Sequence, residues 1–322
     1  MIFASSLYHR INLRVGRSSR PAILLFLLVL LLSSHTVWAR GVRFDVQGIS
    51  GDLQDNVENY LAAMPSFRAD RLAYRHAQVL DAITKGLQSM GYYSAKIDLS
   101  QEKPDSDTVL VKIVPGKPVI IRSFRLSLQG DALSDKAFDR LLKRLPLKEG
   151  DIFHHGKYEE IKSLLKNRAL ARGYFDAEMV VSRVKVYPKE YVADVDIEFS
   201  TGHRYKFGEV QIEGITQSQK LIRPLIPFKS GDPYTANKMA AFSQSLSETK
   251  YFREVDVHPL LKDVKNYTVP IYVGLKPKSN NLVEVGLGYA TDEGVRAQLN
   301  WEKPWLNEYL ITIEIQPALA IA

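Results

Sequence analysis

Between residues 42 and 278 the hydrophobic pattern of the chain changes period in a fixed order. Stretches in which apolar and polar residues alternate, as in a half-buried strand, are followed by stretches in which apolar residues recur every three or four positions, as in an amphipathic helix. This order occurs three times. The alternating strand that opens each copy ends at a glycine: Val42, Phe44 and Val46 precede Gly48, Phe124, Leu126 and Leu128 precede Gly130, and Val210 and Ile212 precede Gly214.

The helical part of each copy is interrupted, so it predicts two helices. Proline or glycine breaks the helical period at 64–66, 150–151 and 231–233. Two further strand patterns close each copy. We therefore predict an α+β fold of three tandem β-α-α-β-β modules, in which two helices of about ten to fifteen residues cover one face of a three-stranded sheet.

An aromatic pair follows the second helix of each copy. We expect the rings of each pair to be core anchors at the turn into the next strand and not ligand-binding groups, because aromatic side chains at helical spacing usually belong to a core. Gly91 and Gly173 precede the first two pairs and suit a left-handed helix end, whereas Lys250 precedes the third. The pairs are Tyr92-Tyr93, Tyr174-Phe175 and Tyr251-Phe252.

The joints between copies, 114–118 and 200–203, are short and contain proline or glycine. Short joints keep neighbouring modules close together. We expect a jointed arm with the boundaries 40–117, 118–204 and 205–278.

The pattern changes again in the segment 279–322. Two alternating stretches, 283–289 and 295–301, flank a turn and predict a hairpin, and a third strand can begin near Tyr309. The pattern suits both the first strands of a transmembrane β-barrel and a soluble meander. Membrane strands need about 9–11 residues each, so at most three or four fit. A single-chain barrel needs about eight, so we expect a barrel start that is incomplete within this sequence.

The first 39 residues have the features of an export signal. Arginines precede an apolar run at 22–32, which is shorter than the roughly 20 residues of a spanning helix. Val37 and Ala39 suit the small-residue positions before a cleavage site, so we predict cleavage between Ala39 and Arg40. An uncleaved membrane anchor is the alternative.

Composition and charge narrow the function. The chain of 322 residues has 45% hydrophobic and 25% charged residues, a globular balance, and no cysteine, which excludes disulfides and thiolate chemistry. Export without cysteine favours a Gram-negative periplasm or outer membrane. The net charge of +7 arises largely from four arginines before residue 40, so the rest is nearly balanced and we expect no nucleic-acid partner.

The sequence offers no constellation of catalytic or metal-binding residues. His154 and His155 are adjacent and cannot share a face, so we interpret them as a loop pair. Asp194, Asp196 and Glu198 alternate with apolar residues and predict the solvated face of a strand. We therefore expect no catalytic residues, no metal, no cofactor and no enzyme activity.

Together, the export signal, the three β-α-α-β-β modules and the barrel-like segment resemble the polypeptide-transport-associated (POTRA) modules that precede the barrel of outer-membrane assembly factors. The chain is most similar to the TamA family, the outer-membrane subunits of the translocation and assembly module, and the stretch from 285–289 to 303–307 looks like the barrel entry of that family. The resemblance covers residues 1–310. The chain departs from the family pattern in lacking the rest of the barrel.

The resemblance implies a function in folding and inserting outer-membrane client proteins, autotransporters among them. It also implies an inner-membrane partner that resembles TamB, contact with outer-membrane lipid, and residence in the cell outer membrane with a periplasmic N-terminal arm. Three alternatives remain: a general barrel-assembly subunit, a two-partner secretion transporter, and a soluble periplasmic POTRA scaffold.

A three-stranded sheet leaves a strand edge open, and an open edge can accept an extended segment of another chain. The segment after each aromatic pair is our candidate edge, at 94–101, 176–187 and 253–260, and we place the candidate partner-binding positions at Ile97, Val184 and Val255. The alternative is that these edges are plain surface, shielded by charged residues such as Lys96, Asp98, Arg183 and Lys185.

In the barrel-like segment, the resemblance implies that the first strand can open and template an incoming strand. Our candidate positions are Val285, Gly286 and Gly288. Glycine weakens the packing of a strand and would ease such opening. The alternative is that these glycines serve only the curvature of a barrel.

Overall fold

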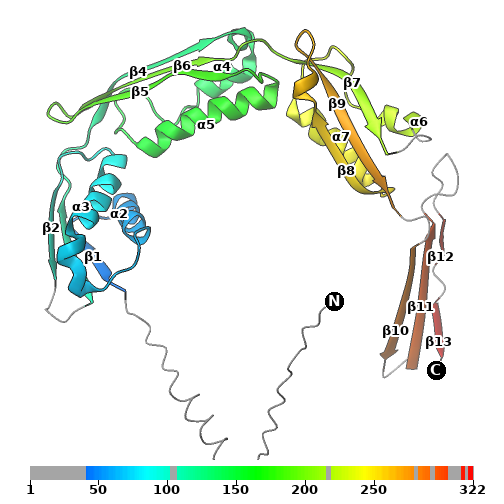
Figure 1. Ribbon diagram of the computed structural model, residues 1–322, viewed down its shortest axis with the longest axis horizontal. Helices are drawn as coiled ribbons and strands as arrows, with labels where there is room; N and C mark the ends of the chain where they lie inside the picture. Colours follow the sequence, from blue (N-terminus) through cyan, green and yellow to red (C-terminus); the bar gives the residue numbers. More distant parts are fainter. Residues whose placement is uncertain are drawn as a thin grey trace, which may run out of the picture.

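The computed structural model describes residues 41–101, 107–214, 219–278, 282–290, 294–303, 313–315 and 318–321. The predicted cleavage site between Ala39 and Arg40 lies outside these residues. Three α/β units follow one another along an arc, and a group of strands follows the third unit (Figure 1). In units 1 and 2 the helices lie on the inner side of the arc and the sheets on the outer side.

Among the described residues, each unit contains three strands, two α-helices and one or two short 3-10 helices. Unit 1 comprises β1 (Arg43–Gln47), α2 (Asp52–Ala62), η1 (Ala69–Arg71), α3 (Leu72–Ser89), β2 (Lys96–Gln101) and β3 (Thr108–Val114). Unit 2 comprises β4 (Ile120–Gln129), η2 (Asp131–Ser134), α4 (Lys136–Leu142), α5 (His155–Arg172), β5 (Glu178–Tyr187) and β6 (Val192–Ser200). Unit 3 comprises β7 (Lys206–Glu213), α6 (Gln219–Ile222), η3 (Arg223–Leu225), α7 (Ala236–Glu248), β8 (Phe252–Pro259), η4 (Leu261–Asp263) and β9 (Thr268–Pro277).

The three sheets share one topology, in which the last strand of each unit lies in the middle. The orders are β1-β3-β2, β4-β6-β5 and β7-β9-β8, with the first strand parallel and the second antiparallel to the central one. Each central strand alternates between buried and more exposed residues, so one face of the sheet meets the helices. The predicted α+β fold of repeated β-α-α-β-β modules is confirmed.

Each unit has its own apolar core between sheet and helices. The helices differ in length from the predicted ten to fifteen residues: α3 and α5 have 18 residues each, while α4 has 7 and α6 has 4. Pro224 stops regular α-helix after α6, because the residue before a proline is disfavoured in helical geometry. The sheet of unit 3 is therefore covered mainly by α7.

The aromatic rings pack on apolar cores, as expected, and each of the first two pairs links neighbouring units. Tyr92 packs on the core of unit 1, but Tyr93 packs on the core of unit 2. Likewise Tyr174 is buried in unit 2, but Phe175 packs on the core of unit 3. Both rings of the third pair belong to unit 3. Successive side chains of an extended segment point in opposite directions, so one pair can serve two cores.

Glycine is required at these joints for two reasons. Gly91 and Gly173 have φ values of 91° and 84°, the left-handed geometry predicted for them. A Cβ atom at Gly173 would also lie 2.7 Å from the Cβ of Tyr234 in unit 3, and one at Gly91 would lie 2.5 Å from the carbonyl oxygen of Phe153 in unit 2. Lys250 has a φ of 61°, so the third helix ends in the same geometry without glycine.

His154 and His155 mark the start of a helix and are not a loop pair as predicted. His155 is the first residue of α5, and His154 is its N-cap, whose Nδ1 accepts a hydrogen bond of 3.3 Å from the backbone N–H of Lys157. Burial lowers the pKa of His154, and the nearby charge of Lys157 lowers it further. Only the neutral ring can accept this hydrogen bond, so the cap depends on pH.

We expect Gly173→Ala to destabilise the chain more than Gly150→Ala. Gly150 has a φ of 87°, and a Cβ added there would meet no other atom within 4 Å, so its replacement costs only the left-handed backbone strain, about 1–2 kcal/mol. At Gly173 the same strain is added to the contact with Tyr234. Urea unfolding followed by circular dichroism measures both losses, and equal losses would contradict a tight joint.

Acidification should weaken the N-terminal cap of α5. Because the pKa of His154 is lowered in the folded chain by burial and Lys157, its contribution to stability is present above the unfolded pKa of about 6.5 and is lost as the pH falls through the folded pKa. His154→Ser replaces the titratable ring nitrogen of the cap by a hydroxyl oxygen and should flatten the loss of α5 amide protection between pH 7 and 5 in hydrogen exchange. The neighbouring His155→Gln is the control and should leave this loss in place.

Candidate strand-binding edges

The strands β2, β5 and β8 lie at sheet edges, and each pairs with a single strand within the described part of the chain. They carry the three predicted positions: Ile97 lies opposite Ile113, Val184 opposite Val195, and Val255 opposite Leu275. The structure does not bring these positions together, because each belongs to a different sheet. They form three separate edges of the same kind.

Each of the three valine or isoleucine side chains is half-buried and packs against the core of its unit. Charged neighbours alternate with them and are exposed, namely Lys96 and Asp98 on β2, Arg183 and Lys185 on β5, and Glu254 and Asp256 on β8. Along each edge, the backbone N–H and C=O groups available to an added strand therefore lie between a row of apolar side chains on one face of the sheet and a row of charged side chains on the other.

The edges differ in regularity. The register of β5 against β6 shifts between Met179 and Val181, and that of β8 against β9 shifts between Phe252 and Glu254. By contrast, β2 pairs with β3 without interruption over six residues. A β-bulge disturbs the regular spacing of backbone donors and acceptors and protects an edge against added strands. The edge of β2 is thus the most regular of the three candidates.

Each sheet has a second edge, on β1, β4 and β7, which the sequence reasoning missed. This edge is partly covered in units 2 and 3, where isolated bridges join Ile120 to Ile152 and Lys206 to Pro233. In unit 2 the carboxylate of Glu149 also accepts a hydrogen bond of 3.0 Å from the backbone N–H of Phe124. Open grooves lie beside β1, with a volume of about 360 Å³, and beside β7, with a volume of about 690 Å³. The signal in the sequence that could have indicated this second edge is the strand-helix-strand order, because such a crossover typically places its two strands in parallel.

The outer face of the unit 2 sheet carries the three acidic residues that the sequence placed on a solvated face. Each has a partner on β4: Asp194 binds Arg122 through two hydrogen bonds of 2.9 and 2.5 Å, Asp196 lies 3.8 Å from Arg125, and Glu198 accepts a hydrogen bond from Gln129. The hydrogen bond from Arg122 lowers the pKa of Asp194. These contacts join strands across the sheet and form no catalytic arrangement.

Within the described ranges, no group of three or more histidine, aspartate or glutamate residues could hold a metal ion. Of the helices that the structure describes, none has the length and apolar character needed to cross a membrane.

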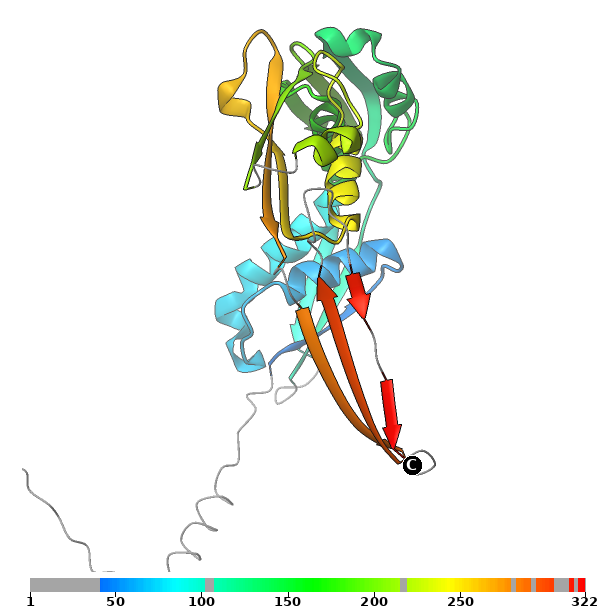
Figure 2. The ribbon, with the colours of Figure 1, turned by 90° about the vertical axis from the view of Figure 1, so that its right-hand side faces the viewer.

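The strands after unit 3 form one sheet. The strand β10 (Leu282–Ala290) pairs along its length with β11 (Gly294–Lys303), and two short strands, β12 (Ile313–Ile315) and β13 (Ala318–Ile321), pair with the other side of β11. Figure 2 shows these strands side by side. Tyr309, where a third strand was predicted to begin, lies outside the described residues.

The three candidate templating positions all lie in β10. Val285 pairs with Leu299, Gly286 with Gln298 and Gly288 with Arg296. Val285 is 70% exposed. Of the described strands, β10 pairs only with β11.

Comparisons with known proteins place these units in a family. A family model described as POTRA domain, TamA domain 1, matches residues 43–115, and a POTRA model described as surface antigen variable number repeat matches residues 125–201 and 205–278. The outer membrane protein assembly factor BamA of Nitratidesulfovibrio vulgaris is 24% identical over 216 residues, which are 65% of this chain and 27% of that protein. The chain thus spans about a quarter of the length of this relative.

Solved structures are similar to this chain, and the first of the two described next shows the same fold. The crystal structure of Haemophilus ducreyi BamA lacking POTRA domains 1–3 has a TM-score of 0.50 at 16% identity, and the match covers 62% of this chain and 37% of that one. POTRA domains 3–5 of Haemophilus influenzae BamA match with a TM-score of 0.42 at 18% identity, over 74% of this chain and 96% of that one. The three matched stretches of this chain are therefore POTRA domains.

Proposed function

We propose that this chain is the POTRA arm of a TamA-type outer-membrane assembly factor, which captures extended client or partner segments on its sheet edges. The clients are outer-membrane proteins, autotransporters among them. The partner is an inner-membrane protein resembling TamB. The arm lies in the periplasm and leads into a barrel, begun by β10 and β11, in contact with outer-membrane lipid. The chain acts by binding and has no catalytic role.

The observation that carries the proposal is the regular outer edge of β2. Four to six backbone hydrogen bonds to an added strand, at a net of about 0.5–1.5 kcal/mol each, give only several kcal/mol. The cost of ordering the added segment offsets much of this gain. Such an edge binds weakly and with little dependence on sequence, because the contacts are to the main chain. Weak, tolerant binding suits a factor that must release its clients.

The match of residues 43–115 to the first POTRA domain of TamA favours the TamA type over a general barrel-assembly subunit or a two-partner secretion transporter. The exposed apolar side chains of Val283 and Val285 on β10 favour a membrane-embedded segment over a soluble scaffold. In this proposal the first barrel strand, with Gly286 and Gly288, opens to template an incoming strand.

Proline in β2 should reduce the capture of extended segments. The backbone N–H groups of adjacent strand residues point to opposite sides of the strand. One of the two variants Ile97→Pro and Asp98→Pro therefore removes a hydrogen-bond donor from the outer edge of β2. The other removes a hydrogen bond to β3, where Ile113 and Lys112 lie opposite these positions. The outward variant should keep its unfolding temperature and lose most crosslinks to outer-membrane proteins. Crosslinks are measured in cells with a photoreactive residue at Ser100.

Val184→Pro and Val255→Pro, in the interrupted strands β5 and β8, are the matched comparisons and should reduce crosslinking less. A photoreactive residue at Ala77, on the exposed side of α3, controls for random encounter. Undiminished crosslinking at β2 in both proline variants would rule out strand addition at this edge.

Extraction of membranes with alkaline carbonate separates an assembly factor from a soluble scaffold. The gene product in its native outer membrane should stay in the pellet, because membrane strands that begin with β10 and β11 would hold it there. A peripheral protein from the same cells provides the control for complete extraction. Release of the product into the supernatant would support the scaffold.

A further inference from the structure

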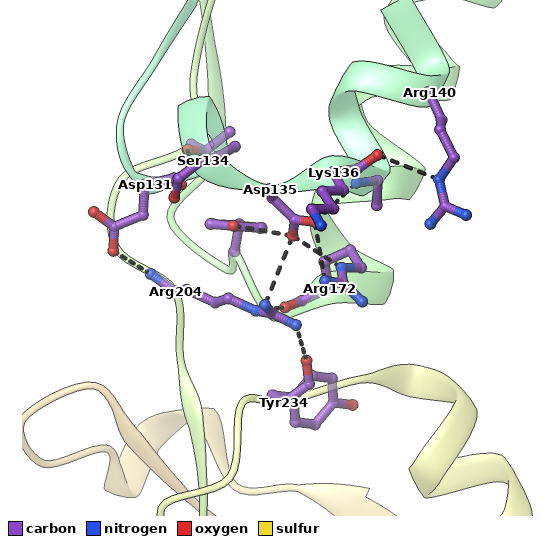
Figure 3. A network of polar contacts seen from close by, with 12 residues as sticks. Asp131, Ser134, Asp135, Lys136, Arg140, Arg172, Arg204 and Tyr234 are labelled. Atoms are coloured by element: carbon purple, nitrogen blue, oxygen red, sulfur yellow. Dashed lines mark hydrogen bonds and ion pairs between the residues drawn. The ribbon is translucent and has the colours of Figure 1, made fainter.

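A buried carboxylate lies where units 2 and 3 meet. Asp135 caps α4 by accepting a hydrogen bond of 2.9 Å from the backbone N–H of Ala137, and its side chain is only 5% exposed. Arg172, at the end of α5, donates two hydrogen bonds to it, of 2.9 and 3.0 Å, and the hydroxyl of Tyr174 donates a third of 3.2 Å. Figure 3 shows the side chains of Asp135 and Arg172 meeting between the two helices.

The charge of Asp135 is stabilised by these neighbours. Burial alone would raise the pKa of Asp135, but the hydrogen bonds from Arg172 and Ala137 and the charges of Arg172 and Arg204 lower it overall. A buried carboxylate of this kind is costly to leave without its partners. The cluster therefore resists any movement that would withdraw them.

Arg204, in the segment between the units, extends the cluster into unit 3. Its Nε donates to the carbonyl oxygen of Arg172 at 3.0 Å, and its Nη2 donates to the carbonyl oxygen of Tyr234, just before α7, at 3.3 Å. Its Nη1 lies 3.7 Å from the carboxylate of Asp135. A single guanidinium thus contacts both units and the buried charge (Figure 3).

Apolar and backbone contacts surround the cluster. The ring of Phe175, from unit 2, packs edge to face against Tyr205 and Tyr234 of unit 3, with centroid distances of 5.2 and 4.9 Å. The N–H of Tyr205 donates to the carbonyl oxygen of Gly173 at 2.8 Å, and the hydroxyl of Tyr205 donates to the carboxylate of Asp176. Contacts of three kinds therefore oppose rotation of unit 3 against unit 2.

The joint between units 1 and 2 has the backbone and aromatic contacts without the charged cluster. The N–H of Val119 donates to the carbonyl oxygen of Gly91 at 2.8 Å, and Tyr93 packs on the core of unit 2. In the part of the chain that the structure describes, no ion pair connects units 1 and 2. The two joints thus differ by the Asp135–Arg172–Arg204 cluster.

We infer that units 2 and 3 move as one rigid body, locked by the Asp135–Arg172–Arg204 cluster, and that the arm bends at the joint between units 1 and 2. Arg204 is the positioning residue, because it is the side chain that bonds to the backbone of both units. The strand edges of β5 and β8 then keep a fixed relative orientation, while the edge of β2 changes direction with the movement of unit 1.

Distances between spin labels test this inference in the full chain. The chain has no cysteine, so introduced pairs are the only labelling sites. One pair, Ser163→Cys and Ala241→Cys, spans units 2 and 3, and another, Ala77→Cys and Ser163→Cys, spans units 1 and 2; all three positions are exposed. Pulsed electron-electron double resonance should give a narrow distribution for the first pair, at least twofold narrower than for the second.

Arg204→Ala should broaden the distribution of the Ser163–Ala241 pair at least twofold and leave the Ala77–Ser163 pair unchanged. Arg204→Lys keeps the positive charge but lacks the planar guanidinium that donates to both carbonyl oxygens. This variant should therefore broaden the distance distribution of the Ser163–Ala241 pair as well. Arg122→Ala is the matched control, since it also removes a guanidinium that pairs with a carboxylate, but on the outer face of unit 2.

Two results would overturn the inference: an unchanged Ser163–Ala241 width in Arg204→Ala, or a wild-type width equal to that of the Ala77–Ser163 pair. Asp135→Asn provides a second route, with the same broadening expected. Because Asp135 also caps α4, circular dichroism must show that this variant is folded. If it is unfolded, the Arg204 variants alone decide, since Arg204 lies outside the helices and strands of both units.

Discussion

The burial of one face of a central strand is the constraint on which each unit depends. In β3, β6 and β9 every second residue is almost inaccessible to solvent, and these residues meet the helices on one side of the sheet. In the sequence, two helices and the second strand separate the first strand from the central strand, whereas the second strand leads directly into the central one. The central strand is thereby paired on both sides, so the open edges fall on its two neighbours.

This arrangement explains why much of the fold could be predicted from the sequence. The change from alternating to helical periodicity is local, and its three repetitions predicted the α+β fold and the element order. The predicted edge segments also fell on edge strands, because a strand that leads directly into the central one has only one side left. The parallel edge at β1, β4 and β7 was missed, since it depends on pairing between distant strands.

The joints could not be predicted, for a physical reason. Periodicity shows that Tyr93 and Phe175 are apolar anchors, but it does not say which of two adjacent cores receives them. The cluster at Asp135 is even harder to predict from the sequence, because its partners Arg172 and Arg204 are distant in the sequence and resemble ordinary surface residues. Long-range polar contacts leave no periodic trace in a single sequence.

The contacts of Arg204 with Arg172 and Tyr234 are to main-chain oxygens, which every amino acid possesses. This part of the joint is consequently indifferent to which side chains occupy those two positions. It is instead sensitive to chain length between Ser200 and Tyr205, since inserting or deleting one residue there would carry the guanidinium away from both carbonyls. Related arms could therefore vary widely in composition at this elbow while preserving its residue count.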